Sequence, residues 1–154
     1  MELYQQHHSK AMSFFKMADH LIYVTLPAVD DVKLIMTALE DIHIALTSGM
    51  NAVLEYERMH KRIMPLTGNF DSRLDVFSNL AGRHGFIGDE IYLIKEIRKL
   101  TEDRKSASME FTRPGKFVIC NEDYRMKTIS INEIKKYLSI TKNFLSKVNN
   151  VIKG

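Results

Sequence analysis

The chain has 154 residues, of which 45% are hydrophobic and 27% are charged, and its formal net charge is +3. These values are typical of a single folded domain over residues 1–154, and the modest charge does not by itself indicate a polyanion partner. Charged residues and histidines interrupt every apolar stretch, so we expect no membrane-spanning helix. The absence of a signal-like amino-terminal segment and the single cysteine, Cys120, predict a cytoplasmic protein.

Helical periodicity dominates the first half of the chain. Apolar residues at three- and four-residue steps predict a helix from about Glu2 to Thr25, which the segment around Pro27 ends. Asp30 or Asp31 is expected to cap the second helix. A heptad seam from Val32 to Ile63 makes this helix the clearest element, and such a seam requires partner helices.

Gly49 lies inside this seam. A glycine in the interior of a helix costs about 1 kcal/mol relative to alanine, so we expect another helix to cross closely at this point. Asp71 is expected to cap a short helix over residues 72–82, and a glycine-rich corner follows at residues 82–88. Asp89 and Glu90 then begin a third long helix, where acidic residues suit the positive end of the helix dipole.

Residues 109–129 lack helical periodicity. After a turn at Pro114 and Gly115 they contain two extended runs, 117–119 and 124–129, on either side of a turn at residues 121–123, which predicts a β-hairpin. Ser130 and Glu133 then form a capping-box pattern that opens the last helix. The fold class expected from these elements is all-α, an up-and-down four-helix bundle with a small β-hairpin insert before the last helix. The hairpin either closes one end of the bundle or presents its basic residues to a partner.

Two Glu-x-x-His patterns occur, at Glu40–His43 and at Glu57–His60, and this spacing is used by di-iron helical bundles. Both patterns lie on the second helix and are separated by roughly 25 Å along its axis, so they cannot share one metal pair. We therefore interpret both histidines as residues on the flank of the bundle. No paired cysteines or His-Glu-x-x-His motif occur, so we expect no metal, no cofactor and no identifiable catalytic residue.

Basic residues gather at the end of the second helix, in the hairpin and on one side of the last helix. If the hairpin folds back along the last helix, the basic residues of these two elements form one basic surface that can hold phosphates. The alternative is a solvated lysine face that keeps the protein soluble. The candidate nucleic-acid or anion-binding residues are Arg58, Arg62, Arg113, Lys116, Arg125, Lys127, Lys135 and Lys142.

Three segments, KMADHLIYVTLPAVDDVKLI, AVLEYERMHKRI and MEFTRPGKFVICNEDYRMKTISINEIKKYL, resemble a family of small archaeal proteins of unknown function. The helical layout also resembles the HEPN superfamily, whose bundles often dimerise and often act on RNA. Catalytic HEPN members carry an Arg followed by four to six residues and a His, and no Arg of this chain has that spacing. The resemblance therefore implies a non-catalytic binding module that contacts RNA or a protein partner through a basic face.

Two further expectations concern assembly and the alternative function. Apolar residues lie on more than one side of the first two helices, which predicts a homodimer. The alternative function is an enzyme whose site is assembled from dispersed residues near Arg58, His60 and the 109–129 hairpin. A polar pocket that joins His60, Arg104 and Arg113 would favour this alternative.

Overall fold

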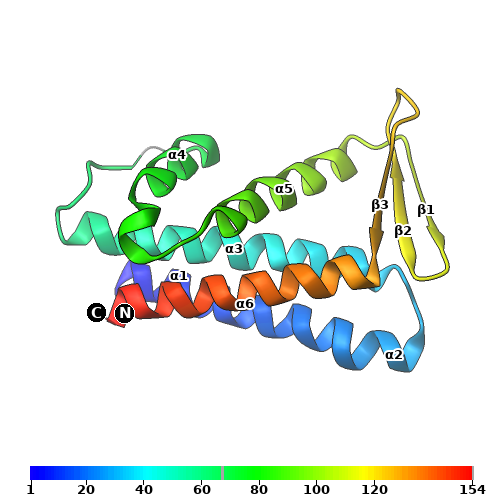
Figure 1. Cartoon of the computed structure of the whole chain (residues 1–154), viewed down its shortest axis with the longest axis horizontal. Helices are drawn as coiled ribbons and strands as arrows, with labels where there is room; N and C mark the ends of the chain where they lie inside the picture. The colour runs from blue at the N-terminus through cyan, green and yellow to red at the C-terminus, as the bar shows by residue number, and fades with distance from the viewer. Residues whose placement is uncertain (67, 154) are drawn as a thin grey trace.

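Helices make up most of the computed structural model, which describes residues 1–66 and 68–153 (Figure 1). The chain begins with α1, a π-helical segment and α2, and continues with α3, α4 and a 3-10 helix. It then forms α5, three strands and α6. Their bounds are α1 Leu3–His20, the π-helix Leu21–Thr25, α2 Leu26–Val29, α3 Leu34–Met59, α4 Phe70–Leu80, the 3-10 helix Ala81–His84, α5 Gly88–Lys105, β1 Met109–Arg113, β2 Lys116–Cys120, β3 Met126–Ser130 and α6 Ile131–Lys153.

The central element is α3, which packs against α1, α4, α5 and α6. Its predicted seam is buried, because Ile35, Leu39, Ile42 and Leu46 are each at most 1% exposed. Burial of these side chains supplies the apolar contact that holds the neighbouring helices to α3. The mainly helical fold class is therefore confirmed, with the short helix α4 added to the long helices α1, α3, α5 and α6.

Gly49 lies where α6 crosses α3, as the sequence predicts. A Cβ atom built at this position would lie 2.8 Å from Phe144 Cε2 and 2.9 Å from Leu145 Cδ2. Carbon atoms in ordinary contact are about 3.5–4.0 Å apart, so no side chain fits here without displacing its neighbours. The cost of a glycine within the helix is thus offset by a close helix crossing.

The first predicted helix differs from the structure at its carboxyl end. Regular α-helix ends at His20, and the π-helical segment and α2 extend the helical path to Val29. Pro27 does not break the chain because it lies in the first turn of α2, where a missing N–H leaves no hydrogen bond unmade. The break comes at Asp30, which adopts a left-handed conformation with φ of 51°.

Two of the predicted helix caps can be compared directly with side-chain contacts. The N-cap of α3 is Lys33, which makes no side-chain cap hydrogen bond, so neither Asp30 nor Asp31 caps this helix as predicted. Asp31 Oδ1 instead accepts a hydrogen bond from the Lys33 backbone N–H at 3.0 Å, before the helix begins. The cap of α4 is Asn69 rather than Asp71, because Asn69 Oδ1 accepts from the Ser72 N–H at 2.7 Å. Asp71 lies inside the first turn of α4, where its charge favours the positive helix end.

The predicted hairpin is part of a three-stranded antiparallel sheet in the order β1-β2-β3. The additional strand is β1, and the two-residue turn at Pro114 and Gly115 joins it to β2. Gly115 has φ of 68°, a conformation that glycine adopts without strain. Phe117, Ile119 and Ile129 of the sheet belong to the hydrophobic core, so the sheet is anchored to the helices by burial.

The sheet stands across one end of the helices and does not lie along α6 (Figure 1). Ser130 ends β3, and Ile131 begins α6 immediately. The predicted capping box is confirmed, since the Glu133 N–H donates to Ser130 Oγ at 3.1 Å and the Ser130 N–H donates to Glu133 Oε1 at 3.4 Å. Among the described residues, no helix combines the length and the hydropathy that a membrane crossing requires.

Candidate nucleic-acid interface

The eight predicted basic residues lie in four places on the structure, of which the β1–β2 turn adjoins the start of α6 through the pairing of Lys116 with Ser130. Because the sheet stands across the helices, its basic residues do not lie along those of α6 (Figure 1). The four places are the carboxyl end of α3 with Arg58 and Arg62, the β1–β2 turn with Arg113 and Lys116, the β2–β3 end of the sheet with Arg125 and Lys127, and α6 with Lys135 and Lys142. The single basic surface of the sequence argument is therefore not formed by these residues together.

Both arginines at the end of α3 are engaged by buried carboxylates. Arg58 Nε lies 2.7 Å from Glu55 Oε2, and Arg62 Nη1 lies 3.4 Å from Glu57 Oε2. The Arg62 guanidinium also lies over the Tyr56 ring, 6.0 Å from its centroid. These contacts use the cations to compensate buried negative charge, so neither arginine is an uncommitted phosphate ligand.

Glu57 is fully buried, which the sequence pattern does not reveal. His84 Nε2, from the 3-10 helix, forms a hydrogen bond with Glu57 Oε1. His60, the residue that shares a Glu-x-x-His pattern with Glu57, instead contacts the Tyr56 carbonyl oxygen through Nδ1 at 2.9 Å. A pairing between residues 27 positions apart leaves no periodic signal, so sequence reasoning could not find it.

The two predicted lysines of α6 face α1 and its π-helical extension. Lys135 Nζ lies 5.2 Å from the centroid of the Tyr23 ring. Lys142 lines a hollow of about 280 Å³ together with His8 and Met12 of α1. The pKa of His8 is lowered by burial and by the positive charge of Lys153. This side of α6 is thus an apolar seam with lysines at its rim.

A hollow of about 530 Å³ lies between α5 and the end of the sheet, and we call it the α5–sheet groove. Arg125 and Lys127, two of the predicted residues, converge here with Lys99 of α5. The groove is lined by Lys99, Asp103, Ile119, Asn121, Arg125, Met126 and Lys127. Lys127 Nζ is 3.7 Å from Glu96 Oε1, so three cations are only partly balanced by Asp103 and Glu96.

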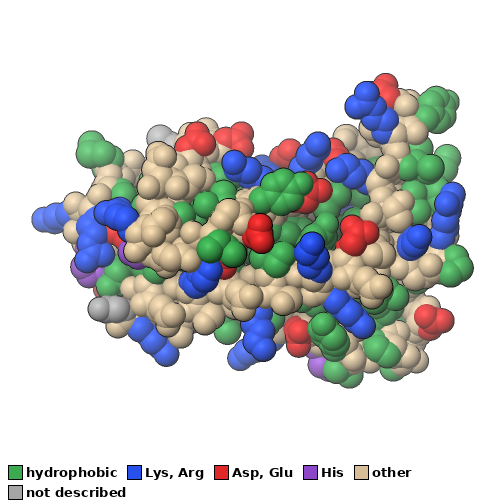
Figure 2. Space-filling view, viewed as in Figure 1, with side chains coloured by type: hydrophobic (Ala, Val, Ile, Leu, Met, Phe, Trp, Pro, Cys, Tyr) green, Lys and Arg blue, Asp and Glu red, His purple; other side chains and the backbone are tan. Residues whose placement is uncertain are grey.

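Sequence reasoning missed Lys99 because it is one of several charged residues on an exposed helix face. Nothing in the local pattern distinguishes it from its neighbour Lys95. Its position becomes informative only when the sheet is placed beside the carboxyl half of α5 (Figure 1), and Figure 2 shows Lys and Arg side chains on this face of the molecule.

The β2–β3 turn, which carries the groove residues Asn121 and Arg125, also holds an exposed aromatic side chain. Tyr124 is 88% exposed and has φ of 59°, which is uncommon for a bulky residue. The turn is held by Asn121, whose Oδ1 accepts hydrogen bonds from the N–H groups of Asp123 at 3.0 Å and Arg125 at 2.9 Å. The Tyr124 ring is therefore exposed to solvent at the residue before Arg125, at the cost of some local strain.

A second hollow, of about 440 Å³, lies between α3, α5 and β1. Arg104 forms ion pairs there with Glu40 and, at 3.2 Å, with Glu110. Burial, Arg98 and Lys105 lower the pKa of His43, which also lines this hollow. Together these contacts connect β1 to both helices.

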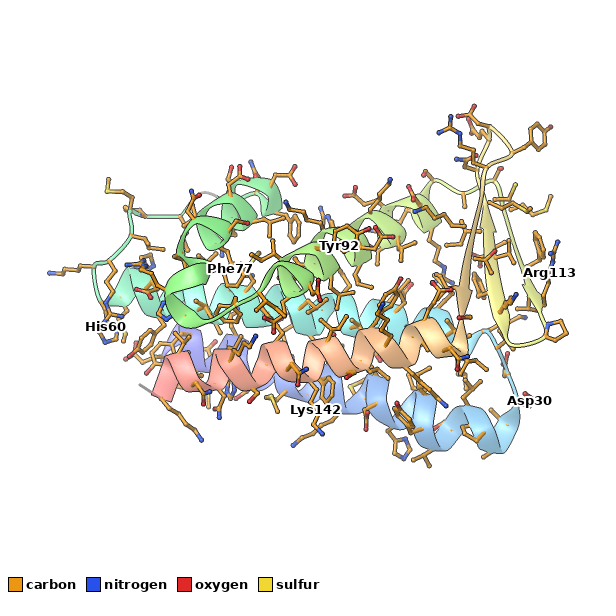
Figure 3. The ribbon with its side chains drawn as sticks, in the orientation of Figure 1. Asp30, His60, Phe77, Tyr92, Arg113 and Lys142 are labelled. Carbon is orange, nitrogen blue, oxygen red and sulfur yellow. The ribbon has the colours of Figure 1, made fainter. Side chains whose placement is uncertain are left out.

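The residues named for a dispersed enzyme site do not converge in the described chain. His60 and Arg113 lie at opposite ends of the molecule (Figure 3). Arg104 is held at the hollow between α3, α5 and β1 by Glu40, near the start of α3, whereas His60 follows its last residue. The polar pocket that would have favoured the enzyme alternative is therefore not assembled from these three residues.

Within residues 1–66 and 68–153, no group of three or more His, Cys, Asp or Glu side chains is arranged to hold a metal ion. Glu40 and Glu57, the acids of the two Glu-x-x-His patterns, are both engaged by basic partners. Comparisons of the chain with protein-family models, with curated proteins and with solved structures found no match.

Proposed function

We propose that this protein is a binding module that contacts single-stranded RNA through the α5–sheet groove and Tyr124. The observation that carries the proposal is the convergence of Lys99, Arg125 and Lys127 in one groove, together with Tyr124, the residue that directly precedes Arg125 and is 88% exposed. Cations hold the phosphates of a strand without reading its sequence, and an exposed aromatic ring stacks on an unpaired base.

The geometry favours a single strand over a duplex. Bases in a duplex are stacked on one another, so the Tyr124 ring could not reach a base face without disrupting the helix. The groove presents few groups that could read base edges, with Asn121 already committed to the turn. The proposed binding is therefore weakly sequence-specific and sensitive to salt.

The wider proposal keeps the other expectations from the sequence. These are a cytoplasmic location, a HEPN-like bundle and a homodimer. The mainly helical fold is compatible with the HEPN resemblance, and HEPN bundles often act on RNA. The proposed contact surface is smaller than the sequence suggested, because Arg58 and Arg62 are engaged by Glu55 and Glu57.

The salt dependence tests the number of phosphate contacts. With up to three phosphates neutralised, the slope of log K against log salt for a single strand should be about −2. Fluorescence anisotropy with a labelled single-stranded RNA of about 10 nucleotides, a length within the usual range of site sizes, gives this slope directly. A slope near zero would exclude phosphate contacts by the groove.

Charge reversal locates the site. The triple variant Lys99→Glu, Arg125→Glu and Lys127→Glu should abolish binding, whereas a matched triple reversal of Lys135, Lys136 and Lys142 on α6 should retain most of it. Tyr124→Ala should weaken binding by about 1–3 kcal/mol, the usual worth of one base–aromatic stack. Equal losses in both triple variants, or no binding by the wild-type protein at low salt, would contradict the proposal.

A further inference from the structure

β1 is an edge strand, and within residues 1–66 and 68–153 no second strand pairs with its outer side. It comes first in the sheet order, pairs with β2 on one side only, and lies at the outer edge of the molecule (Figure 1). Four of its five residues are exposed, and Phe111 is half-buried. An uncovered edge presents unpaired backbone N–H and C=O groups that can pair with another strand.

The register of the sheet shows which backbone groups are unpaired. Arg113 and Lys116 close the two-residue turn, so they form a hydrogen-bonded pair of the ladder. Hydrogen-bonded and non-hydrogen-bonded pairs alternate along an antiparallel ladder. Thr112 and Glu110 are therefore the residues of β1 that direct their N–H and C=O groups away from β2.

We propose that two copies of this chain pair through β1, antiparallel, with a two-fold axis at Phe111. In this register, Glu110 of each copy lies opposite Thr112 of the second copy, and the outward groups of these two residues form the hydrogen bonds. Phe111 of one copy lies opposite Phe111 of the other copy. The two residues form a non-hydrogen-bonded pair, in which side chains approach most closely. The two sheets thereby become one six-stranded sheet.

Charge and hydrogen bonding select this register over its neighbours. An axis at Glu110 would place the two Glu110 carboxylates directly opposite each other, and like charges in this position are destabilising. An axis at Thr112 would place Glu110 opposite Pro114, which has no N–H to donate. With the axis at Phe111, the remaining pair joins Met109 to Arg113, so no like charges oppose each other.

This surface differs from the helix faces on which the sequence argument for a homodimer rests. Arg113 lies over its own Phe111 ring, with the guanidinium carbon 5.4 Å from the centroid. Glu110 keeps its ion pair with Arg104, which fixes β1 against α5.

A cysteine at the axis tests the register. In a Cys120→Ser background, Phe111→Cys places two thiols opposite each other with Cα atoms about 4.5 Å apart, within the range of a disulfide. Mild oxidation should convert most of this variant into a covalent dimer. Thr112→Cys in the same background is the matched control, because its thiol lies opposite Glu110 and should cross-link at least about tenfold more slowly.

Sedimentation equilibrium of the unmodified chain, from about 10 to 500 micromolar, tests the association itself, since a small edge contact is expected to be weak. Thr112→Pro removes an outward N–H without removing a bond to β2, so it should abolish the dimer while circular dichroism shows an unchanged fold. A monomer over the whole range would overturn the proposal. A dimer that persists in Thr112→Pro, or equal cross-linking at positions 111 and 112, would also overturn it.

Discussion

Replacement of Gly49 by alanine is the most direct test of the helix crossing on which the fold depends. The added methyl group would lie 2.8 Å from Phe144 Cε2 and 2.9 Å from Leu145 Cδ2. Neither neighbour can move into solvent, because Phe144 is 0% and Leu145 is 2% exposed. Phe144 is further confined by Phe77 and Phe86, whose ring centroids lie 6.0 and 5.3 Å from its own.

Two opposing effects determine the expected change in stability. Alanine gains about 1 kcal/mol over glycine in a helix, whereas forcing an extra methyl group into a packed core costs about 1–3 kcal/mol. Each contact must lengthen by about 0.7 Å to reach ordinary van der Waals distance, which places the cost at the upper end of that range. We therefore expect a net loss of about 1–2 kcal/mol in the free energy of unfolding, or roughly 2–8 °C in Tm.

Urea denaturation followed by circular dichroism measures this loss. Gly88→Ala, in the first turn of α5, is the matched control, because its added methyl group meets nothing within 4 Å. Gly88→Ala should leave the free energy of unfolding unchanged or slightly higher. If Gly49→Ala were as stable as the wild-type protein, the close crossing of α3 and α6 and the physical account of this glycine would both be refuted.

Two further predictions concern histidines. Burial, Arg98 and Lys105 lower the pKa of His43 in the folded chain below its ordinary value of 6.5. As the pH drops below about 6.5, this histidine therefore takes up a proton more readily in the unfolded chain than in the folded chain, and the free energy of unfolding should fall. His43→Gln should reduce this fall in urea denaturation at pH 7.5 and 5.0, although His7 and His8 retain the same trend, and an unchanged pH dependence would contradict the reasoning. His84→Ala should cost about 3 kcal/mol, because it removes the principal partner of the fully buried Glu57. Adding Glu57→Met should restore most of that loss. If His84→Ala alone were as stable as the wild-type protein, the buried pair would contribute nothing to stability.

Local patterns determined much of the architecture. The buried face of α3, the need for a close crossing at Gly49 and the capping box of Ser130 and Glu133 were all predictable from the sequence. Each depends on residues three or four positions apart, or on the conformational preference of one residue. The extended character of the segment before the last helix was readable for the same reason, because turn residues and β-branched runs act over short distances.

Only the tertiary structure decided which side chains from different elements meet. The pairing of Glu57 with His84 depends on how the 3-10 helix packs against α3.

The candidate site shows the same division. Its cations come from α5 and from the β2–β3 end of the sheet, and they converge because the sheet stands across the helices instead of along α6. Arg125 and Lys127 could be singled out from the sequence as basic residues of an extended segment, but their partner Lys99 could not. Sequence periodicity shows which face of a single helix or strand is buried. A site depends instead on how several elements are placed relative to one another, and the burial of many side chains together determines that placement.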